Sequence, residues 1–342
     1  MQAMVLRRLC DVSKEPRPLE PAVLPDPTPG PGEILVRVSA CGVCHTELDE
    51  IEGRTPPAFL PIVLGHQAVG TIEALGPGAD GRIGERIGVA WIYSACGACA
   101  FCRGGLENLC PEFRATGRDA NGGYAELLTV RADFAHPIPP GLGDLEAAPL
   151  LCAGAIGYRS LRLAGLRDGE RLGLTGFGAS AHLVLKLVRR LYPRSEVYVF
   201  ARSPREREFA LELGAVWAGD TEETAPARLR AIIDTTPVWK PVVEALRNLE
   251  PAGRLVVNAI RKESADQQAL LALDYATHLW EEKEVKSVAN VARADVREFL
   301  RLAAEIPIRP EVEEFALRDA NAALAELKSR KIRGAKVLRI PG

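Results

Sequence analysis

Four cysteines crowd one short stretch of this 342-residue chain and limit what it can fold into. They follow the spacing C-x₂-C-x₂-C-x₇-C and fall at Cys96, Cys99, Cys102 and Cys110. Four thiolates this close together can surround one Zn²⁺ ion tetrahedrally and leave it no open position, so the predicted site is structural and performs no chemistry. Two disulfides or four inert thiols are the alternatives.

Composition excludes several classes of function. The net charge is −2 with both signs mixed along the chain, so we expect neither a basic surface for nucleic acid nor a polybasic membrane segment. The N-terminal stretch lacks the apolar core of a signal peptide, and no apolar run is long enough to span a bilayer. We therefore expect a cytoplasmic protein whose reduced thiols are more often metal ligands than disulfide partners.

The pattern of the chain changes near residue 154. Before it, short β-branched runs are separated by Gly and Pro clusters, which predicts a β-rich domain. After it, strands and amphipathic helices alternate, which predicts βαβ crossovers and a parallel sheet. The main elements expected are strands at 34–39, 68–73, 86–90, 171–175, 196–200, 231–234, 254–258 and 335–340, and helices at 179–191, 204–213, 237–248, 293–305 and 319–328.

A glycine-rich loop joins the strand expected at 171–175 to the helix expected at 179–191. It reads G-x-G-x-x-A and begins at Gly176 and Gly178. The first glycine permits a tight turn, the second lets the backbone approach a pyrophosphate, and the small third residue lets the helix pack on the strand. We expect Gly176, Gly178, Ala179 and Ser180 to bind a dinucleotide at the helix N-terminus. A glycine turn in a domain that binds no nucleotide is the alternative.

In such a domain, the residue at the end of the next strand contacts the adenosine ribose of the cofactor. NAD-specific sites usually place Asp or Glu there, to bond the 2′-hydroxyl. This chain has Ala201, Arg202 and Ser203 instead. A missing carboxylate beside an arginine favours the 2′-phosphate of NADP, with NAD still possible. Alternatively, Arg202 belongs to a solvated run of charged residues.

Several motifs of the chain resemble those of one protein family and occur in the same order. They are Cys41-Gly-Val-Cys44-His45-Thr46, Gly65-His66-Gln67, the four-cysteine run, Gly122-Gly123-Tyr124-Ala125-Glu126, Leu151-Cys152-Ala153-Gly154 and the glycine-rich loop. Over essentially its whole length, the chain resembles the zinc-dependent medium-chain alcohol dehydrogenases.

The resemblance implies a set of site residues. Cys44, His66 and Cys152 correspond to the ligands of a catalytic zinc with an open fourth position, which makes two zinc ions per subunit. Thr46 would bond the substrate oxygen and begin a proton relay, Asp49 stands where that relay often ends in histidine, and His45 would contact the cofactor pyrophosphate. Trp91 would line the substrate pocket. Gln67 replaces the glutamate that the family usually places after the histidine ligand.

The resemblance also implies the fold and the partners. We expect an α/β protein with a GroES-like β-rich catalytic domain at 1–153 and 293–342, and a Rossmann doubly wound parallel sheet at 154–292. The substrate would be a small primary or secondary alcohol, or the matching aldehyde or ketone, and the assembly a homotetramer or a homodimer. The alternative function is that of a zinc-containing quinone or enoyl reductase of the same superfamily. A zinc-ribbon module for nucleic acid is a third reading, and the acidic balance argues against it.

Overall fold

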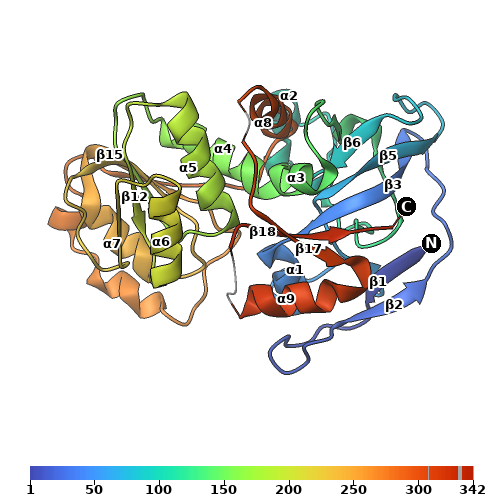
Figure 1. Cartoon of the computed structure of the whole chain (residues 1–342), viewed down its shortest axis with the longest axis horizontal. Helices are drawn as coiled ribbons and strands as arrows, with labels where there is room; N and C mark the ends of the chain where they lie inside the picture. The colour runs from blue at the N-terminus through green and yellow to red at the C-terminus, as the bar shows by residue number, and fades with distance from the viewer. Residues whose placement is uncertain (307, 330–332, 342) are drawn as a thin grey trace. The chain divides into compact units, whose positions relative to one another are not determined.

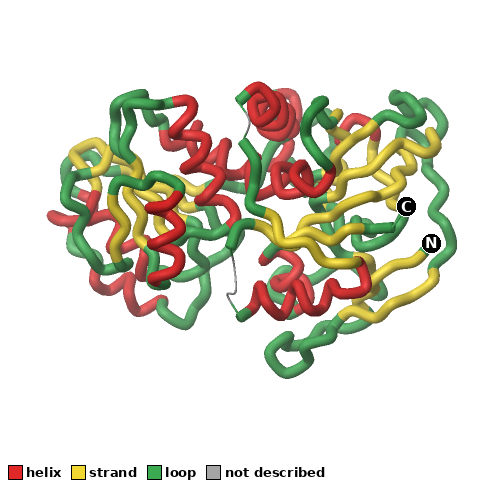
Figure 2. The backbone as a smooth tube through the Cα atoms, in the orientation of Figure 1, coloured by secondary structure: helices red, strands yellow, loops and turns green. Residues whose placement is uncertain are grey.

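The computed structural model describes residues 1–306, 308–329 and 333–341 and divides the chain into two compact units. Unit 1 comprises Met1–Ala155 and Val291–Gly342, and unit 2 comprises Ile156–Asn290. The domain boundaries expected from the sequence lie after residues 153 and 292. Figure 1 follows the chain through both units, and Figure 2 shows that strands form the middle of each.

Unit 1 is built on a mostly antiparallel sheet in the order β10-β6-β5-β3-β18-β17, in which β9 also pairs with β3. The long strand β3 is central because it pairs with β5, β9 and β18. A second sheet has the order β2-β1-β4, and β7 pairs with β8. The strands are β1 (Gln2–Leu6), β2 (Leu19–Val23), β3 (Glu33–Val43), β4 (Ile62–Val63), β5 (Ala68–Leu75), β6 (Arg86–Val89), β7 (Ile92–Ser94), β8 (Arg114–Ala115), β9 (Leu127–Arg131), β10 (Ala135–Pro137), β17 (Val312–Ala316) and β18 (Ala335–Arg339).

Helical segments connect the strands of unit 1, and large apolar side chains fill its core. Tyr124, Phe134 and Leu48 are among the large side chains fully buried in its core. Aromatic and aliphatic side chains of this size contribute about 1.5–3 kcal/mol each when they leave water. The helical segments are α1 (His45–Ile51), α2 (Ala100–Arg103), η1 (Glu107–Leu109), η2 (Ala132–Phe134), α3 (Asp144–Pro149), η3 (Leu150–Gly154), α8 (Arg293–Glu305), η6 (Leu317–Asp319) and α9 (Ala320–Lys328).

Unit 2 is a parallel six-stranded sheet in the order β13-β12-β11-β14-β15-β16. The central strands β11 and β12 are buried at every residue, as expected of strands covered on both faces, whereas the end strand β16 is exposed at every residue. The strands are β11 (Leu172–Thr175), β12 (Val197–Phe200), β13 (Trp217–Gly219), β14 (Leu229–Asp234), β15 (Leu249–Val257) and β16 (Glu284–Ser287). The helical segments are α4 (Ala155–Ala164), α5 (Ala179–Leu191), α6 (Pro204–Glu212), α7 (Lys240–Asn248), η4 (Gln267–Ala272) and η5 (Tyr275–Leu279).

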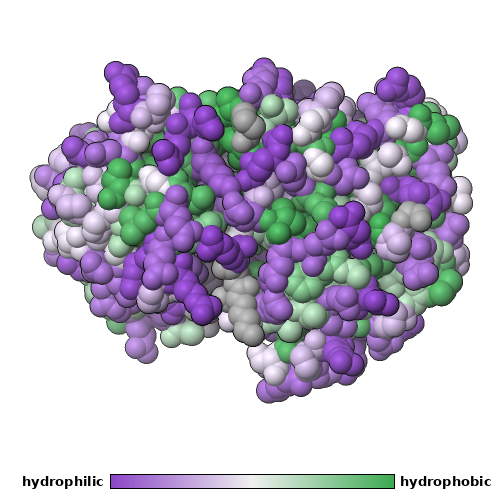
Figure 3. Space-filling model, in the orientation of Figure 1, coloured by the Kyte–Doolittle hydropathy of each residue, from purple (hydrophilic) through white to green (hydrophobic). Residues whose placement is uncertain are grey.

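The strand order of unit 2 follows the chain outward in both directions from β11. This is the classic doubly wound order, so the predicted fold class, a β-rich GroES-like domain plus a Rossmann sheet, is confirmed. On the face seen in Figure 3, hydrophobic side chains form small groups among hydrophilic ones. No helix of the described residues has the length and apolar character needed to cross a membrane.

Candidate active site and metal centres

Three side chains from distant parts of the sequence converge in unit 1. Cys44 directly precedes α1, His66 follows β4, and Cys152 lies in η3, a single π-helical turn. Their ligand atoms all lie within 4.8 Å of one another, and His66 Nε2 is 3.3 Å from Cys152 Sγ. Zinc–sulfur and zinc–nitrogen bonds of about 2.3 and 2.1 Å place tetrahedral ligand atoms roughly 3.5 Å apart, so this set fits a zinc ion.

Glu47 orients the histidine of this cluster. The chain at Cys44 is extended and turns into α1 at the next residue, so Glu47 lies in the first helical turn. Its Oε2 accepts the main-chain N–H of Cys44 at 2.8 Å, and its Oε1 is 2.6 Å from His66 Nδ1. An ionised carboxylate only accepts hydrogen bonds, so His66 donates from Nδ1 and directs Nε2 toward the thiols, where it would bind a metal once it loses its proton.

The protonation of the cluster also suits a metal. A hydrogen bond from the Cys152 thiol lowers the pKa of Cys44 well below its usual value, and the same bond raises the pKa of Cys152. Burial disfavours a charged imidazole, but the Glu47 carboxylate outweighs it and raises the pKa of His66 well above its usual value. The pocket thus favours anionic sulfur beside positive charge, which a bound cation would supply.

The other residues predicted for catalysis lie around this cluster. The Thr46 hydroxyl is 3.6 Å from Cys44 Sγ and is buried, while His45 beside it is exposed. The buried Trp91 ring meets the His66 ring edge-on, with centroids 5.2 Å apart. Asp49 is buried on the next turn of α1 and pairs with Arg54 Nε at 2.5 Å.

Glu47 and Glu50 were not predicted from the sequence. Burial, and then the nearby Glu47 carboxylate, raise the pKa of Glu50 well above its usual value. The signal for Glu47 was present, because an acidic residue three positions after an extended residue is typical of a helix start. Glu50 gives no such signal, since its burial depends on packing that the local sequence does not reveal. Gln67 is buried too and lies over Gly42, where any side chain would collide with the Gln67 amide.

The four-cysteine run forms one compact lobe between β7 and β8. Cys96 Sγ is 3.8 Å from Cys102 Sγ and 3.5 Å from Cys110 Sγ, and all four sulfurs lie within 4.8 Å of one another. Tetrahedral zinc needs sulfurs about 3.8 Å apart. All eight cysteines of the chain are free thiols, so no disulfide competes for these sulfurs.

Backbone N–H groups of the lobe point at its sulfurs. Cys96 Sγ accepts from the N–H of Cys99 at 3.3 Å, and Cys99 Sγ accepts from the N–H of Cys102 at 3.4 Å. Bonds from the N–H groups of Ala98 and Cys99 lower the pKa of Cys96 to about 7, whereas burial raises the pKa of Cys102 to about 12. The N–H groups of the first two-residue gap thus favour the thiolate of Cys96, the form that binds metal.

An ion pair anchors this lobe to the rest of unit 1. Arg293 Nε, at the start of α8, is 2.7 Å from Glu107 Oε1 in η1, and the Glu107 side chain is almost fully buried. The Arg293 guanidinium also lies 4.6 Å from the centroid of the Phe134 ring. These contacts hold η1, the outer turn of the lobe, against the start of α8.

The glycine-rich loop of unit 2 makes a tight turn and leaves open space before α5. Gly176 has φ +75°, which favours glycine, and its N–H donates to Phe200 O at 2.8 Å. A Cβ built at Gly178 meets nothing within 4 Å, so the space over this residue is open. Ala179 and Ser180 then begin α5, and the N-terminus of a helix favours a bound anion.

The segment predicted to read the ribose follows β12. Ala201 is buried and donates its N–H to Gly219 O, while Arg202 is exposed. Ser203 precedes α6 as its N-cap. Arg207 Nη1 donates to Ala201 O at 2.7 Å and to Arg202 O at 3.0 Å, which fixes the main chain of this segment.

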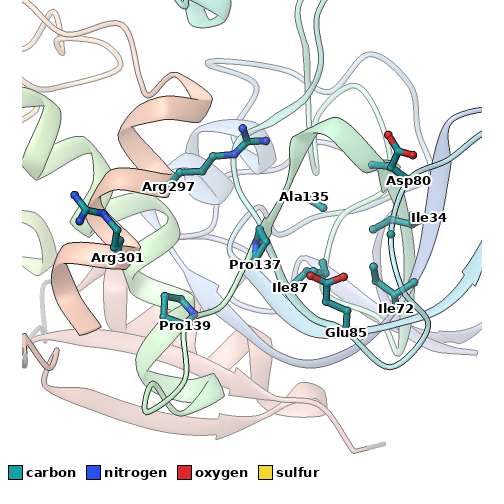
Figure 4. Close-up of a pocket in the computed structure, with 12 residues that line it drawn as sticks. Ile34, Ile72, Asp80, Glu85, Ile87, Ala135, Pro137, Pro139, Arg297 and Arg301 are labelled. Atoms are coloured by element: carbon teal, nitrogen blue, oxygen red, sulfur yellow. The ribbon is translucent and has the colours of Figure 1, made fainter. Parts of the chain in front are cut away.

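A groove of about 480 Å³ also opens on unit 1. In Figure 4, Arg297 and Arg301 of α8 lie on one side, Asp80 and Glu85 on the other, and apolar residues such as Ile87 form the floor. None of the three converging ligands lines this groove, so it is separate from the candidate metal centre.

The chain is similar to known dehydrogenases along almost all of its length. Residues 30–140 match the family model of the alcohol dehydrogenase GroES-like domain. The chain is 43% identical to the probable alcohol dehydrogenase AdhA of Mycobacterium tuberculosis, over 94% of this chain and 93% of that protein. It is 32% identical to an alcohol dehydrogenase of Geobacillus stearothermophilus, over 90% and 92%.

Solved structures show the same fold. A cinnamyl alcohol dehydrogenase from Sorghum bicolor superimposes with a TM-score of 0.83 at 27% identity, over 99% of this chain and 97% of the other. Together with the strand order and the converging thiols, these similarities define a two-domain dehydrogenase. The chain belongs to the medium-chain alcohol dehydrogenase family.

Proposed function

We propose that this protein is a zinc-dependent alcohol dehydrogenase that interconverts a small primary or secondary alcohol with its aldehyde or ketone. One observation carries the proposal. Two thiols and a histidine from distant segments converge within 4.8 Å, in a chain that also has an open phosphate-binding loop. The first feature fits a catalytic zinc and the second fits a nicotinamide dinucleotide.

Each chain would hold two zinc ions. Cys96, Cys99, Cys102 and Cys110 would enclose the structural one. Cys44, His66 and Cys152 would hold the catalytic one and leave it a fourth position. When bound there, zinc would supply a Lewis acid that polarises a carbonyl and lowers the pKa of an alcohol.

The residues of the chain would handle the proton and orient the substrate. When bound, an oxidised nicotinamide would supply the hydride acceptor for the carbinol carbon, and with loss of the hydroxyl proton the products would be a carbonyl compound, the reduced cofactor and H⁺. The Thr46 hydroxyl would accept that proton and pass it on, with Asp49 at the end of the relay. Trp91 would form an apolar wall of the substrate pocket, and His45 would bond the cofactor pyrophosphate.

NADP is the proposed cofactor, with NAD as a weaker substitute. Gly176, Gly178, Ala179 and Ser180 would hold the pyrophosphate, and Ala201, Arg202 and Ser203 would surround the 2′-phosphate. The Arg202 guanidinium is exposed and its charge acts on the Glu206 carboxyl in α6, while Ala201 offers no carboxylate to repel a phosphate. A charge-assisted contact contributes on the order of 1.5–3 kcal/mol, which corresponds to about a ten- to hundredfold preference.

The test is a panel of alcohols, aldehydes and ketones, scored as kcat/KM with NADPH and with NADH. The protein should act on members of the panel and prefer NADPH. Ala201→Asp should reverse the cofactor preference because its carboxylate repels the 2′-phosphate. A wild type that prefers NADH, or an unmoved ratio in Ala201→Asp, would refute the cofactor assignment. Activity only on quinones or enoyl compounds would instead favour the reductase alternative.

We also propose a homo-oligomer, a tetramer or a dimer, in the cytoplasm. The end strand β16 of unit 2 is exposed at every residue and has a partner strand, β15, on one side. The crossover before β16 exposes Leu271, Tyr275 and Trp280 to between 59% and 88%. An open strand edge beside large apolar side chains is a surface that a second copy can cover.

A further inference from the structure

A buried ion pair lies at the carboxyl edge of the sheet in unit 2. Lys262 follows β15, and Asp234 is the last residue of β14. Their side chains are 8% and 0% exposed. Desolvating two charges costs several kcal/mol per ion, so a buried pair is weak evidence of a stabilising role and calls for another explanation.

Every polar group of this pair has a partner. Asp234 Oδ1 accepts from the Thr175 hydroxyl at 2.5 Å and from the Thr236 hydroxyl at 2.8 Å, and Asp234 Oδ2 accepts from Lys262. The Lys262 ammonium also donates to Thr236 O at 2.7 Å and to Val238 O at 3.0 Å. Two of its three bonds therefore fix the main chain of residues 235–238, called here the β14 loop, and the third reaches the Asp234 carboxylate.

The β14 loop borders the place where a dinucleotide would bind. From β11 the chain adds β12 and β13 toward one edge of the sheet. It then returns and adds β14 on the other flank of β11, so the direction in which strands are added reverses between β11 and β14. Ligands of doubly wound sheets bind outside the carboxyl ends of the strands at this switch point. A Cβ at Gly176 would lie 3.0 Å from both Thr235 Oγ1 and Thr236 Cγ2, so the β14 loop contacts the glycine-rich loop.

We propose that Lys262 is a positioning residue for the nicotinamide cofactor, an inference that rests on the proposed function. By holding the carbonyls of Thr236 and Val238, it fixes the wall of the crevice opposite the glycine-rich loop. A lysine suits this task because its compact ammonium can donate three bonds in different directions. Asp266 secures the far end of the same wall, since its two carboxylate oxygens accept the N–H of Trp239 at 3.0 and 2.8 Å.

The experiment separates positioning from stability. Lys262→Met alone leaves Asp234 charged and buried, so we combine it with Asp234→Asn to remove both charges. The dissociation constant of NADPH is measured by fluorescence titration and the melting temperature by calorimetry, on metal-loaded protein. Lys240→Met is the control, because Lys240 lies in the same region but pairs with Glu222 at the exposed surface.

If Lys262 positions the cofactor, cofactor affinity should fall while the melting temperature stays nearly unchanged. The Asp234→Asn/Lys262→Met variant should melt near the wild-type temperature but bind NADPH about ten- to hundredfold more weakly, with kcat at saturating cofactor much less affected. Lys240→Met should bind as the wild type does. A wild-type dissociation constant in the double variant would overturn the inference and leave Lys262 a structural residue.

A second variant tests the inference even if the double variant does not fold. Lys262→Arg keeps the charge beside Asp234, but its planar fork cannot make the same three bonds. It should fold and bind NADPH more weakly, and unchanged binding would overturn the inference. If the wild type binds neither NADPH nor NADH, the proposed function itself fails, and this result is known before any variant is compared.

Discussion

The two thiol clusters of this protein differ in how the chain builds them. The four-cysteine lobe takes all its ligands from residues 96–110, and its own N–H groups stabilise the thiolates. The Cys44–His66–Cys152 cluster takes its ligands from three separate segments between residues 44 and 152 and depends on Glu47 to orient its histidine. A local cluster needs only its own loop, whereas a distributed cluster needs the folded domain around it. This difference suits a structural role for the first and a catalytic role for the second.

Removing ligands should separate the two clusters most strongly. His66→Ala or Cys152→Ala should lower turnover by about 10³-fold or more, because the Lewis acid they would hold contributes several kcal/mol. The fold should persist, as circular dichroism and the melting temperature would show. Cys102→Ser should do the opposite, lowering the melting temperature while the surviving folded protein keeps much of its turnover. If substitutions in the two clusters changed turnover and the melting temperature equally, the two clusters would not have different roles.

Glu47→Gln should have the next largest effect. A glutamine side chain can accept the hydrogen bond of His66 or that of the Cys44 N–H, but not both, so one of the two oriented ligands is released. Groups that orient metal ligands are typically worth 10- to 100-fold in metal affinity or activity. Zinc affinity and kcat/KM should both fall by roughly that factor. Glu50→Gln is the matched control on the same helix, and a similar loss in both variants would argue against a specific role for Glu47.

Sequence reasoning succeeded where the structure is local. The lobe could be predicted from four residues and their spacing, and helices α5 and α8 begin and end at the predicted residues. The cluster of Cys44, His66 and Cys152 could be proposed only through family resemblance, because no local pattern links them. Glu50 and the Lys262–Asp234 pair were missed for the same reason. Their burial arises when separate segments pack, and a single sequence does not show which segments meet.

Acid should also lower the stability of the framework that anchors the lobe. Burial, and then the charges of Arg297 and Arg293, lower the pKa of His136 to about 3. Unfolded histidine has a pKa of about 6.5, so between these values the unfolded state binds a proton that the folded state excludes. The free energy of unfolding should therefore fall by about 1.4 kcal/mol per pH unit below pH 6.5, and this loss should end near pH 3.

Urea denaturation at several pH values measures this slope. His136→Phe cannot titrate, so it should lose this part of the pH dependence while other groups keep theirs. Identical slopes for the wild type and His136→Phe would show that His136 becomes protonated in the folded protein.

Timed removal of zinc tests the central claim most directly. The protein is mixed with a chelator, and the zinc that remains bound, the activity and the melting temperature are followed together. The account predicts two zinc ions per chain at the start. Activity should disappear as the Cys44–His66–Cys152 cluster loses its metal, while about half of the zinc and the folded state remain. Loss of both ions in step with unfolding, or activity that survives the first loss, would contradict the assignment of one closed structural site and one open catalytic site.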